Sequence, residues 1–495
     1  MNNKLKKTLI PLFNSAQKTA FFCAALHLCP AFAAQNLYFD TAYVPETGEN
    51  LTAADNWYVD SARTELFSGT LGADYNGIIN SRGDLYISKG DSGTLELNSL
   101  SFILSDVGST SIIPDMMVIW NGGIRLVEDF NFDITVSPSS TAAASNYIRL
   151  VGNKTVNVGG NLNINYNQNG GSNYTLSIFC KDTSGNPTAM NIGGDINVVS
   201  ADGSPFRLRF GLTNMEVGGV MHIGNTIWTV TTVESSTNQG YMSRVIGGLD
   251  SGGEIGVMMA SKIGGIEFRN SGICEWAGTF SSGRDDDAKG DIDITMNANS
   301  VNGRQTLRFT GKAYGVATNL NNVAINNGRL DLGMYSGMKG NRLSLIGSGG
   351  TFSPTGIGGG DIGTVTFAEG EWYAGKIALD IEGEASYDKI AFEGNLEKTG
   401  NNISLELSFD EYTIAELIGA SGEDEFVLSD MITYAAGSSI EGTVLVGSSG
   451  KIRWEAAFGE TSMNVAFSAI PEPSEIAAVF GAAALALAIR RRKGN

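Results

Sequence analysis

Short runs of alternating apolar and polar residues, separated by Gly and Asn, fill the chain between residues 35 and 470. The clearest runs cover residues 95–97, 148–151, 156–158 and 162–164. Alternation with a period of two buries one face of a β-strand, and Gly and Asn favour turns. The pattern therefore predicts an all-β body built from short strands.

One phrase recurs in this body, and it consists of two alternating runs on either side of a Gly-Gly pair. Its clear copies are residues 156–164, 190–198 and 215–223, and its fainter copies are 246–249, 263–266 and, with Asn-Asn-Gly at the turn, 323–332. The first three copies begin 34 and 25 residues apart. We expect the glycines to supply the positive φ angle that a sharp corner requires.

A unit of this kind cannot bury its apolar face alone, whereas a stack of such units can. Irregular repeats of this length predict a parallel β-helix, or β-solenoid, over residues 91–399. Stack ends expose unpaired strand edges, so terminal caps are expected. We assign the N-terminal cap and first strands to residues 35–90, with Trp57 among the closing residues, and a C-terminal cap or small β domain to 400–468. Tandem β-sandwich domains are the alternative, because their strands also alternate and recur.

The expected C-terminal unit contains one helical signal. Residues 412–418 predict one or two helical turns, and the strand pattern resumes at 443–446. This unit is therefore expected to mix a short helix with strands.

The N-terminus has the features of a secretory signal peptide. Four lysines precede residue 20, residues 20–28 are mostly apolar, and small residues follow at Ala31, Ala33 and Ala34. This order predicts cleavage near Ala33 or Ala34, so that residues 1–34 are removed during export.

The C-terminus carries a second targeting pattern. An apolar run at 476–489 separates a Pro-Glu-Pro triplet from a basic cluster, and the residues concerned are Pro471, Glu472, Pro473, Arg490, Arg491 and Arg492. As a helix the run reaches about 21 Å, whereas a permanent membrane span usually takes about 20 residues. The basic cluster predicts a cytoplasmic C-terminus, with everything upstream on the other side of the membrane.

This order of triplet, apolar helix and basic stop resembles the PEP-CTERM sorting signal of Gram-negative bacteria. The resemblance implies that residues 469–495 form a sorting signal with a short transmembrane helix. It also implies an exosortase-type processing enzyme as a partner, a transient membrane anchor, and delivery to the cell surface or extracellular matrix. An ordinary tail anchor is the simpler alternative.

A second resemblance involves residues 323–332 and the stretch from 363–367 to 388–390. These segments are similar to the passenger repeats of autotransporter-type surface proteins, with the Pro-Glu-Pro tail standing where that family has a membrane barrel. The resemblance implies an elongated surface β-helix and no particular activity.

The charge of the chain narrows the range of partners. The formal net charge is -19, and the segment 1–34 holds four lysines and no acid, so its removal makes the charge -23. Nucleic acid is excluded as an expected partner, because binding it requires clustered Lys and Arg. Self-repulsion favours solubility.

Few residues are suited to catalysis or metal binding. Cys180 and Cys274 are the cysteines that remain after processing, and either a disulfide or two buried thiols would fit. The chain lacks cysteine and histidine spacings typical of metal sites, and His222 is the one histidine left. Ser92, in a protease-like Gly-Asp-Ser-Gly, has no mature histidine before it to act as base. We therefore expect no catalytic, cofactor-binding or metal-binding residues.

The strongest enzymatic alternative is an acidic run. Arg284 precedes Asp285, Asp286 and Asp287, and Asp291 and Asp293 follow. Paired carboxylates can cleave polysaccharides or bind calcium, although a solvated loop is the simpler interpretation. The sequence thus predicts an exported, non-enzymatic structural or adhesive β-solenoid associated with exopolysaccharide or cell-surface glycans. A polysaccharide lyase or hydrolase on a β-helix is the alternative.

Overall fold

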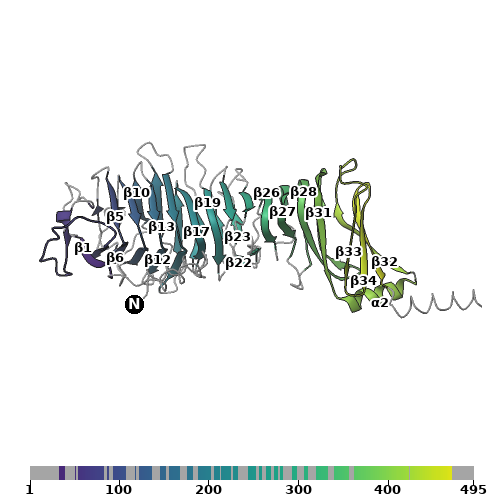
Figure 1. Cartoon of the computed structure of the whole chain (residues 1–495), viewed down its shortest axis with the longest axis horizontal. Coiled ribbons are helices and arrows are strands. Elements are labelled where there is room, and N and C mark those ends of the chain that lie inside the picture. The colour runs from purple at the N-terminus through teal and green to yellow at the C-terminus, as the bar shows by residue number, and fades with distance from the viewer. Residues whose placement is uncertain are drawn as a thin grey trace, which may run out of the picture.

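The structure is a computed structural model that describes residues between 33 and 470. Its gaps lie between secondary-structure elements, and the longest are 40–50, 108–116, 232–243, 282–291 and 310–318. Most of the described residues lie in β-strands, so the predicted all-β class is confirmed. The strands stand side by side in chain order along an elongated molecule (Figure 1).

Three ladders of parallel strands organise the chain. The first ladder consists, in order, of β1 (Gln35–Phe39), β3 (Tyr75–Arg82), β6 (Ser99–Val107), β9 (Phe130–Val136), β12 (Leu162–Asn167), β15 (Ile196–Ser200), β17 (Thr213–Ile223), β19 (Arg244–Ser251), β22 (Ile273–Trp276), β25 (Thr306–Phe309), β26 (Asn319–Asp331), β27 (Lys339–Ser353), β28 (Thr364–Gly383) and β31 (Leu396–Phe409). Each strand pairs with the strands before and after it.

The second ladder runs beside the first, and the longer strands β17, β19, β26, β27 and β28 belong to both. Its other members are β5 (Thr94–Leu97), β8 (Gly123–Leu126), β11 (Val156–Val158), β14 (Thr188–Ile192), β21 (Gly264–Phe268), β24 (Ile292–Asn297) and β30 (Lys389–Phe392). Because the two ladders share strands, they form one continuous sheet.

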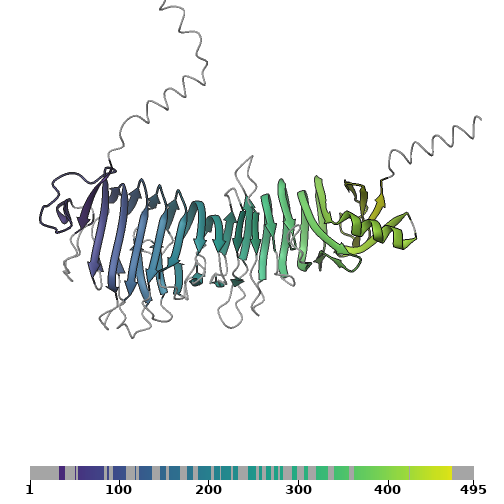
Figure 2. The same ribbon diagram turned by 90° about the horizontal axis from the view of Figure 1, so that it is seen from below.

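The third ladder is a separate eight-stranded sheet. Its members are β4 (Tyr86–Ile87), β7 (Met117–Val118), β10 (Ser145–Val151), β13 (Thr175–Lys181), β16 (Phe206–Gly211), β18 (Ile227–Thr231), β20 (Gly256–Met258) and β23 (Thr279–Ser281). Figure 2 shows the long row of strands of the large sheet from below.

The repeated phrase stacks on itself in register. Met190 pairs with Val156 on one side and with Met215 on the other. Beyond the Gly-Gly pair, Ile196 pairs with Leu162 and with Met221 in the same way. The spacings of 34 and 25 residues seen in the sequence are therefore the chain lengths between stacked strands.

One fainter copy is shifted within this stack. Its Gly-Gly pair lies inside β21, where Gly265 pairs with Arg244 and Ile266 pairs with Val245, and Val245 in turn pairs with Met215. This Gly-Gly pair therefore does not lie over the Gly-Gly pairs of the clear copies, although β21 belongs to the second ladder.

The inward faces of the ladders form an apolar core. Phe102, Phe130 and Phe132 are buried, with ring centroids 5.3 Å apart for Phe102 and Phe132 and 4.5 Å for Phe130 and Phe132. In β12 buried and half-buried residues alternate along the whole strand. The apolar residues of the alternating run therefore lie on one face of the strand, and that face is buried.

At the N-terminal end, a short segment packs over β1. The 3₁₀ turn η1 (Ala54–Asn56) leads into β2 (Trp57–Tyr58), which pairs antiparallel with β1. Trp57 is fully buried, its Nε1 donates to Leu51 O at 3.0 Å, and its ring lies 5.1 Å from that of Phe39. An indole places a large apolar area against the first strand of the stack.

At the C-terminal end, the parallel ladder continues to Phe409 in β31 and is followed by a smaller unit. This unit contains α2 (Glu411–Ser421) and an antiparallel sheet in the order β32-β35-β34-β33, formed by β32 (Glu425–Thr433), β35 (Ser462–Ala469), β34 (Ile452–Phe458) and β33 (Val444–Ser449). A short β29 (Ser386–Tyr387) pairs antiparallel with β28. The predicted helical turns and the following strand are confirmed.

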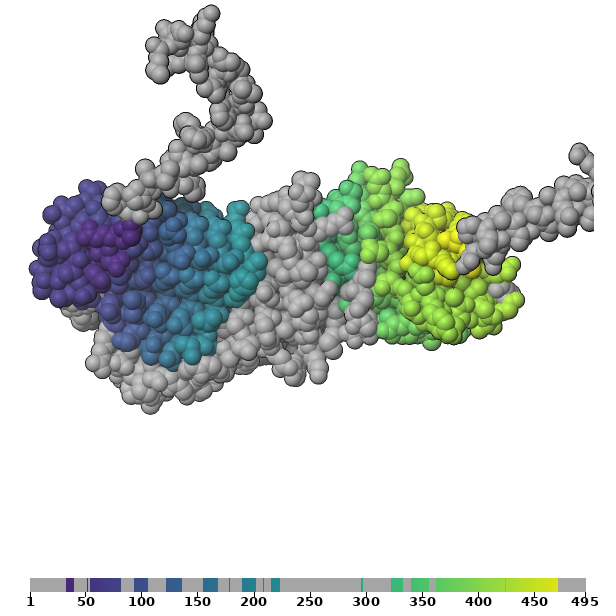
Figure 3. Space-filling view, turned by 60° about the horizontal axis from the view of Figure 1, so that its bottom comes forward, coloured from purple at the N-terminus to yellow at the C-terminus, as the bar shows by residue number. Residues whose placement is uncertain are grey.

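The inner face of the C-terminal sheet packs on the end of the stack. Phe467 lies 5.4 Å from Phe409, and Phe458 lies 6.2 Å from Trp372, measured between ring centroids. The first and last described parts of the chain lie at opposite ends of the described body, as the purple and yellow surfaces of Figure 3 show.

The membrane segment predicted at 476–489 lies outside the described residues. Within the part that the structure describes, no helix is both long enough and apolar enough to span a bilayer.

Candidate functional surface

A line of carboxylate and amide side chains follows the corner where the repeated phrase turns from one ladder to the next. Asp129 Oδ1 accepts from Asn161 N at 2.7 Å, and Asn161 Oδ1 accepts from Asp195 N at 2.7 Å. Asp195 Oδ1 in turn accepts from Val220 N at 2.8 Å. Each of these side chains satisfies a backbone N–H of the next repeat, which would otherwise lose a hydrogen bond at the bend.

A second polar line lies on the outward face of the first ladder. Asn163 Nδ2 donates to Asn131 Oδ1 at 2.7 Å and Asn197 Nδ2 donates to Asn163 Oδ1 at 2.9 Å. At its start, Asn131 Nδ2 donates to Ser101 Oγ at 3.2 Å. An amide can donate and accept at once, so asparagines stacked at the strand spacing of about 4.8 Å form a continuous ladder.

The Gly-Gly corners require space and not a positive φ angle. A Cβ on Gly193 would lie 2.4 Å from Gly159 O, and one on Gly218 would lie 2.3 Å from Gly193 O. None of these three glycines has a positive φ angle, so the predicted reason for glycine was wrong at these corners. It is correct at the Asn-Asn-Gly turn, where Gly328 has a φ of 99°. The glycines let the backbone of one repeat approach the carbonyl of the repeat beneath it.

His222 lies at the end of the outward amide line. It pairs in register with Asn197 of β15, and its Nε2 lies 3.9 Å from Asp195 Oδ2. Both side chains are about half exposed, at 45% and 44%. The remaining histidine is therefore part of the polar surface, next to the corner line.

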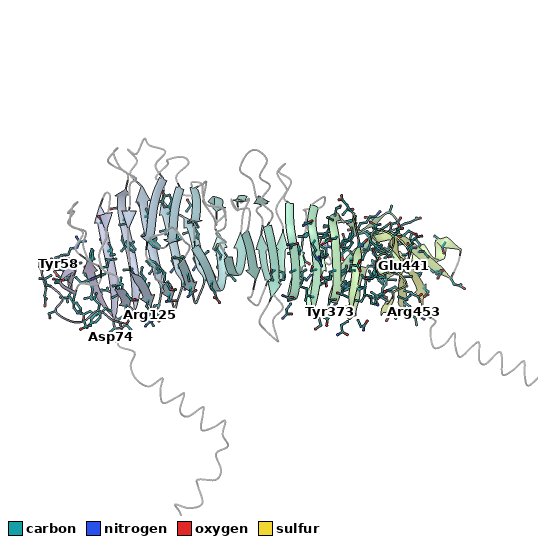
Figure 4. All side chains as sticks on the ribbon, turned by 90° about the horizontal axis from the view of Figure 1, so that it is seen from above. Tyr58, Asp74, Arg125, Tyr373, Glu441 and Arg453 are labelled. Atoms are coloured by element: carbon teal, nitrogen blue, oxygen red, sulfur yellow. The ribbon has the colours of Figure 1, made fainter. Side chains whose placement is uncertain are left out.

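Ion pairs join neighbouring strands on the surface of both halves. In the N-terminal half, Arg125, labelled in Figure 4, places Nη1 3.0 Å from Glu96 Oε1. In the C-terminal half, Arg342 reaches Glu369 at 2.8 Å and Glu371 at 2.6 Å. Exposed pairs of this kind contribute little to stability, so their main effect is on the surface charge.

A buried carboxylate ties three segments together near the C-terminal end. Asp388 is fully buried, and its carboxylate accepts from Thr355 Oγ1 at 2.8 Å, Gly363 N at 3.1 Å and Asp380 N at 3.0 Å. Burial raises the pKa of Asp388 to about 6, and the nearby Asp380 carboxylate adds to the increase. The hydrogen bonds oppose that shift because they favour the charged form.

Sequence reasoning missed this centre, although a signal was present. Asp388, Ile390 and Phe392 alternate in β30 and the residue before it, and all three are buried. A carboxylate at an inward position of an alternating run marks a buried polar group that needs partners.

The predicted processing sites lie at the limits of the described residues. Ala33 is exposed and Ala34 is half-buried, and they directly precede β1. Asn76 Nδ2 donates to Ala34 O at 3.2 Å. Cleavage at either alanine would leave β1 intact. The sorting residues Pro471, Glu472, Pro473, Arg490, Arg491 and Arg492 lie outside the described residues.

The acidic run lies largely outside the described residues too. Arg284, Asp285, Asp286, Asp287 and Asp291 fall in the gap at 282–291, and Asp293 lies in β24. Among the His, Cys, Asp and Glu residues that the structure describes, no group of three or more is placed to hold a metal ion.

The two remaining cysteines lie far apart in the stack. Cys180 is in β13, and Cys274 is in β22, which leads directly into β23. In the third ladder β13 and β23 are separated by three strands, a separation of roughly 19 Å at about 4.8 Å for each step. A disulfide needs Cα atoms within about 7 Å, so this topology places the two residues too far apart to pair.

Comparisons with known proteins identify no relative of this chain: no family model matches it, and neither does a curated protein or a solved structure.

Proposed function

We propose that the protein is an exported, non-enzymatic β-solenoid that a PEP-CTERM-type signal sorts to the cell surface or its polysaccharide matrix. The observation that carries the proposal is the in-register stacking of a repeated unit in a chain bracketed by two targeting patterns. A stack of this kind builds length and surface, which suits a structural or adhesive role.

The solenoid interpretation is supported by the direction of pairing. Antiparallel pairs are confined to β1–β2, β28–β29, β32–β35, β33–β34 and β34–β35 among the named strands of the described part. The three long ladders are parallel and proceed along the chain in the same order. β-Sandwich domains pair their strands antiparallel, so this arrangement favours a parallel β-helix over the alternative.

The sorting interpretation is supported by the place where the described chain ends. Ile470, the residue directly after β35, donates its N–H to Lys451 O at 2.7 Å and is 41% exposed. Pro471 follows at once. A membrane enzyme that cuts near this triplet would work next to an exposed end of the folded body.

The polar lines suit a hydroxyl-rich partner such as exopolysaccharide or a cell-surface glycan. Asn131, Asn163 and Asn197 are half-buried on an outward face and repeat at the strand spacing. Amide and carboxylate groups at regular intervals offer hydrogen-bonding partners to a repeating chain of sugar hydroxyls.

Intact mass tests the proposal. The protein would be recovered from native surface or matrix fractions and from membranes of the same cells. We expect loss of residues near Ala33 and near Pro471. A protein from the membrane fraction that still ends at Asn495 would show a retained anchor and contradict delivery to the matrix.

The same material tests the enzymatic alternative. Asp285, Asp286 and Asp287 would be replaced together by Asn, and polysaccharide turnover would be compared with that of the unsubstituted protein. We expect no difference. Turnover that is lost while the fold is retained would instead favour a carbohydrate-active enzyme.

A further inference from the structure

The outer edge of β33 is an open strand edge in the described part of the chain. β33 pairs with β34 alone among the described strands. Val444 and Val446 are 53% and 61% exposed. Proteins normally protect such edges with charged residues, proline or a covering segment, because an open edge is a template for another strand.

The backbone groups that face this open edge follow from the geometry of the hairpin. Ser449 pairs with Ile452 across a two-residue turn, so the pair is hydrogen-bonded and the next residue toward the N-terminus points its N–H and C=O away from β34. Phe458 N donates to Thr443 O at 2.9 Å, which fixes the same alternation at the other end. Val444, Val446 and Ser448 therefore direct their N–H and C=O groups outward.

The charges along β33 favour another copy of this chain as the occupant. The chain carries a net charge of -19, so two copies repel each other over most of their surfaces. Residues 443–449 contain no charged side chain. On the neighbouring strand, Arg453 and Glu455 lie 4.0 Å apart and cancel each other. The edge of β33 is therefore uncharged on an otherwise acidic protein, so a second copy meets no charge repulsion there.

The register that uses all three outward residues is self-complementary. A two-fold axis at Val446 places Val446 opposite itself and Val444 opposite Ser448 of the second copy. It also brings the Lys451 end of one strand beside the Glu441 end of the other, where opposite charges attract. Glu441 and Arg453 are labelled on the C-terminal unit in Figure 4. The open edge does not extend to Gly442, because Gly442 N already donates to Phe458 O at 2.8 Å.

We propose that two copies of the chain join edge to edge through β33, as an antiparallel two-fold pair centred on Val446. The two C-terminal sheets then form one continuous sheet, and the outward valines of both copies lie side by side. A closed two-fold pair uses up both open edges, so it does not grow into a fibre. The inference depends on β33 and not on the proposed export.

The first test removes one donor without disturbing the hairpin. The full chain would be studied in detergent, which covers the apolar segment 476–489, by light scattering over a range of concentrations. Val446→Pro removes an outward N–H and leaves the pairing with β34, since proline is tolerated at an open edge. We expect the dimer dissociation constant to rise by about tenfold or more. Val446→Thr keeps the N–H and the branched Cβ, so its dimer should persist.

A second test does not depend on the fold of the proline variant. In the proposed register the two Val446 Cα atoms lie about 5.5 Å apart, within the range of a disulfide. Val446→Cys should therefore form covalent dimers on oxidation. Glu455→Cys, one strand further in on the same face, should not. A monomeric unsubstituted chain at every concentration, a dimer unaffected by Val446→Pro, or equal cross-linking by both cysteine variants would each overturn the proposal.

Discussion

At the scale of single residues, the corner positions have the strictest requirement for residue type, because only glycine fits there. Gly193 sits where a side chain would meet the carbonyl of Gly159, and that carbonyl is held in the stack. Gly72 has open space around its Cβ position. Neither glycine has a positive φ angle, so they differ in what a methyl group would encounter.

Gly193→Ala should lower the free energy of unfolding by about 2–3 kcal/mol, because the new Cβ overpacks a site whose neighbour is backbone. Chemical denaturation of the full chain measures the change. Gly72→Ala is the matched control and should stay within about 0.5 kcal/mol of the unsubstituted protein. Equal effects of both variants would show that the close approach at the corner has no energetic weight.

The raised pKa of Asp388 predicts that the stability of the fold depends on pH. Its pKa in the fold is about 6, above the ordinary value of 3.8 for an aspartate, so the folded state holds the proton more tightly than the unfolded chain. The stability that Asp388 contributes is therefore fully present below the unfolded pKa and is lost as the pH rises through about 6. The shift corresponds to about 3 kcal/mol across that range.

Asp388→Asn should remove this contribution, because Asn does not titrate. Free energies of unfolding would be measured at several pH values, and the difference between the two proteins compared, since the other carboxyl groups titrate in both. At low pH the variant should be less stable by about 1–3 kcal/mol, because its Nδ2 cannot accept the hydrogen bonds that the carboxyl oxygen accepts. A difference that stays constant between pH 4 and pH 7 would contradict the assignment.

At the scale of elements, the amide ladder links strands that the apolar core already stacks. Asn163 is its central member, since it donates to Asn131 and accepts from Asn197. Asn165, on the same face of β12, makes an exposed hydrogen bond to Asp133 at 3.2 Å.

Asn163→Ala should destabilise the fold by about 1–2 kcal/mol, because it leaves two half-buried amides without their partner. Asn165→Ala, the matched control, should change the stability by about 0.5 kcal/mol or less. Thermal and chemical unfolding of both variants would be compared. An Asn165→Ala effect as large as that of Asn163→Ala would mean that the ladder contributes no more than any surface amide.

The elements whose sequence signals are local could be predicted from the sequence. The alternating run at 162–164 became β12, and the run at 412–418 became part of α2. Asp410 caps that helix by accepting from Thr413 N at 2.9 Å, and Gly422 ends it with a φ of 71°. The role of Gly193 was not predictable, because it depends on a carbonyl 34 residues away that only the stack brings near. Two of the partners of Asp388, Gly363 and Thr355, come from 25 and 33 residues earlier, so they were hidden for the same reason.

At the scale of the whole molecule, the number of stacked strands decides the shape. Fourteen strands of the first ladder at about 4.8 Å each give a stack roughly 60 Å long before the C-terminal unit is added. Figures 1 and 2 show this length from two sides.

Small-angle X-ray scattering should therefore report an elongated particle. A compact domain of about 435 residues has a radius of gyration near 22 Å, and the value for this protein should be clearly larger. The comparison would be made on monomeric Val446→Pro in detergent, with the micelle contribution matched out by contrast. A radius of gyration near that of a compact domain would contradict the extended stack.

The in-register stacking of the repeated phrase ties the length of the stack to the number of copies. Met215 lies over Met190 as Met190 lies over Val156, so a chain lacking residues 190–214 would set Met215 directly on Val156 and lose one strand spacing. Insertion of such a segment would lengthen the molecule by the same step. The distance between Gln35 and Ile470 is therefore set by the number of stacked copies. Adding or removing one copy changes this distance by one step and leaves both terminal units unchanged.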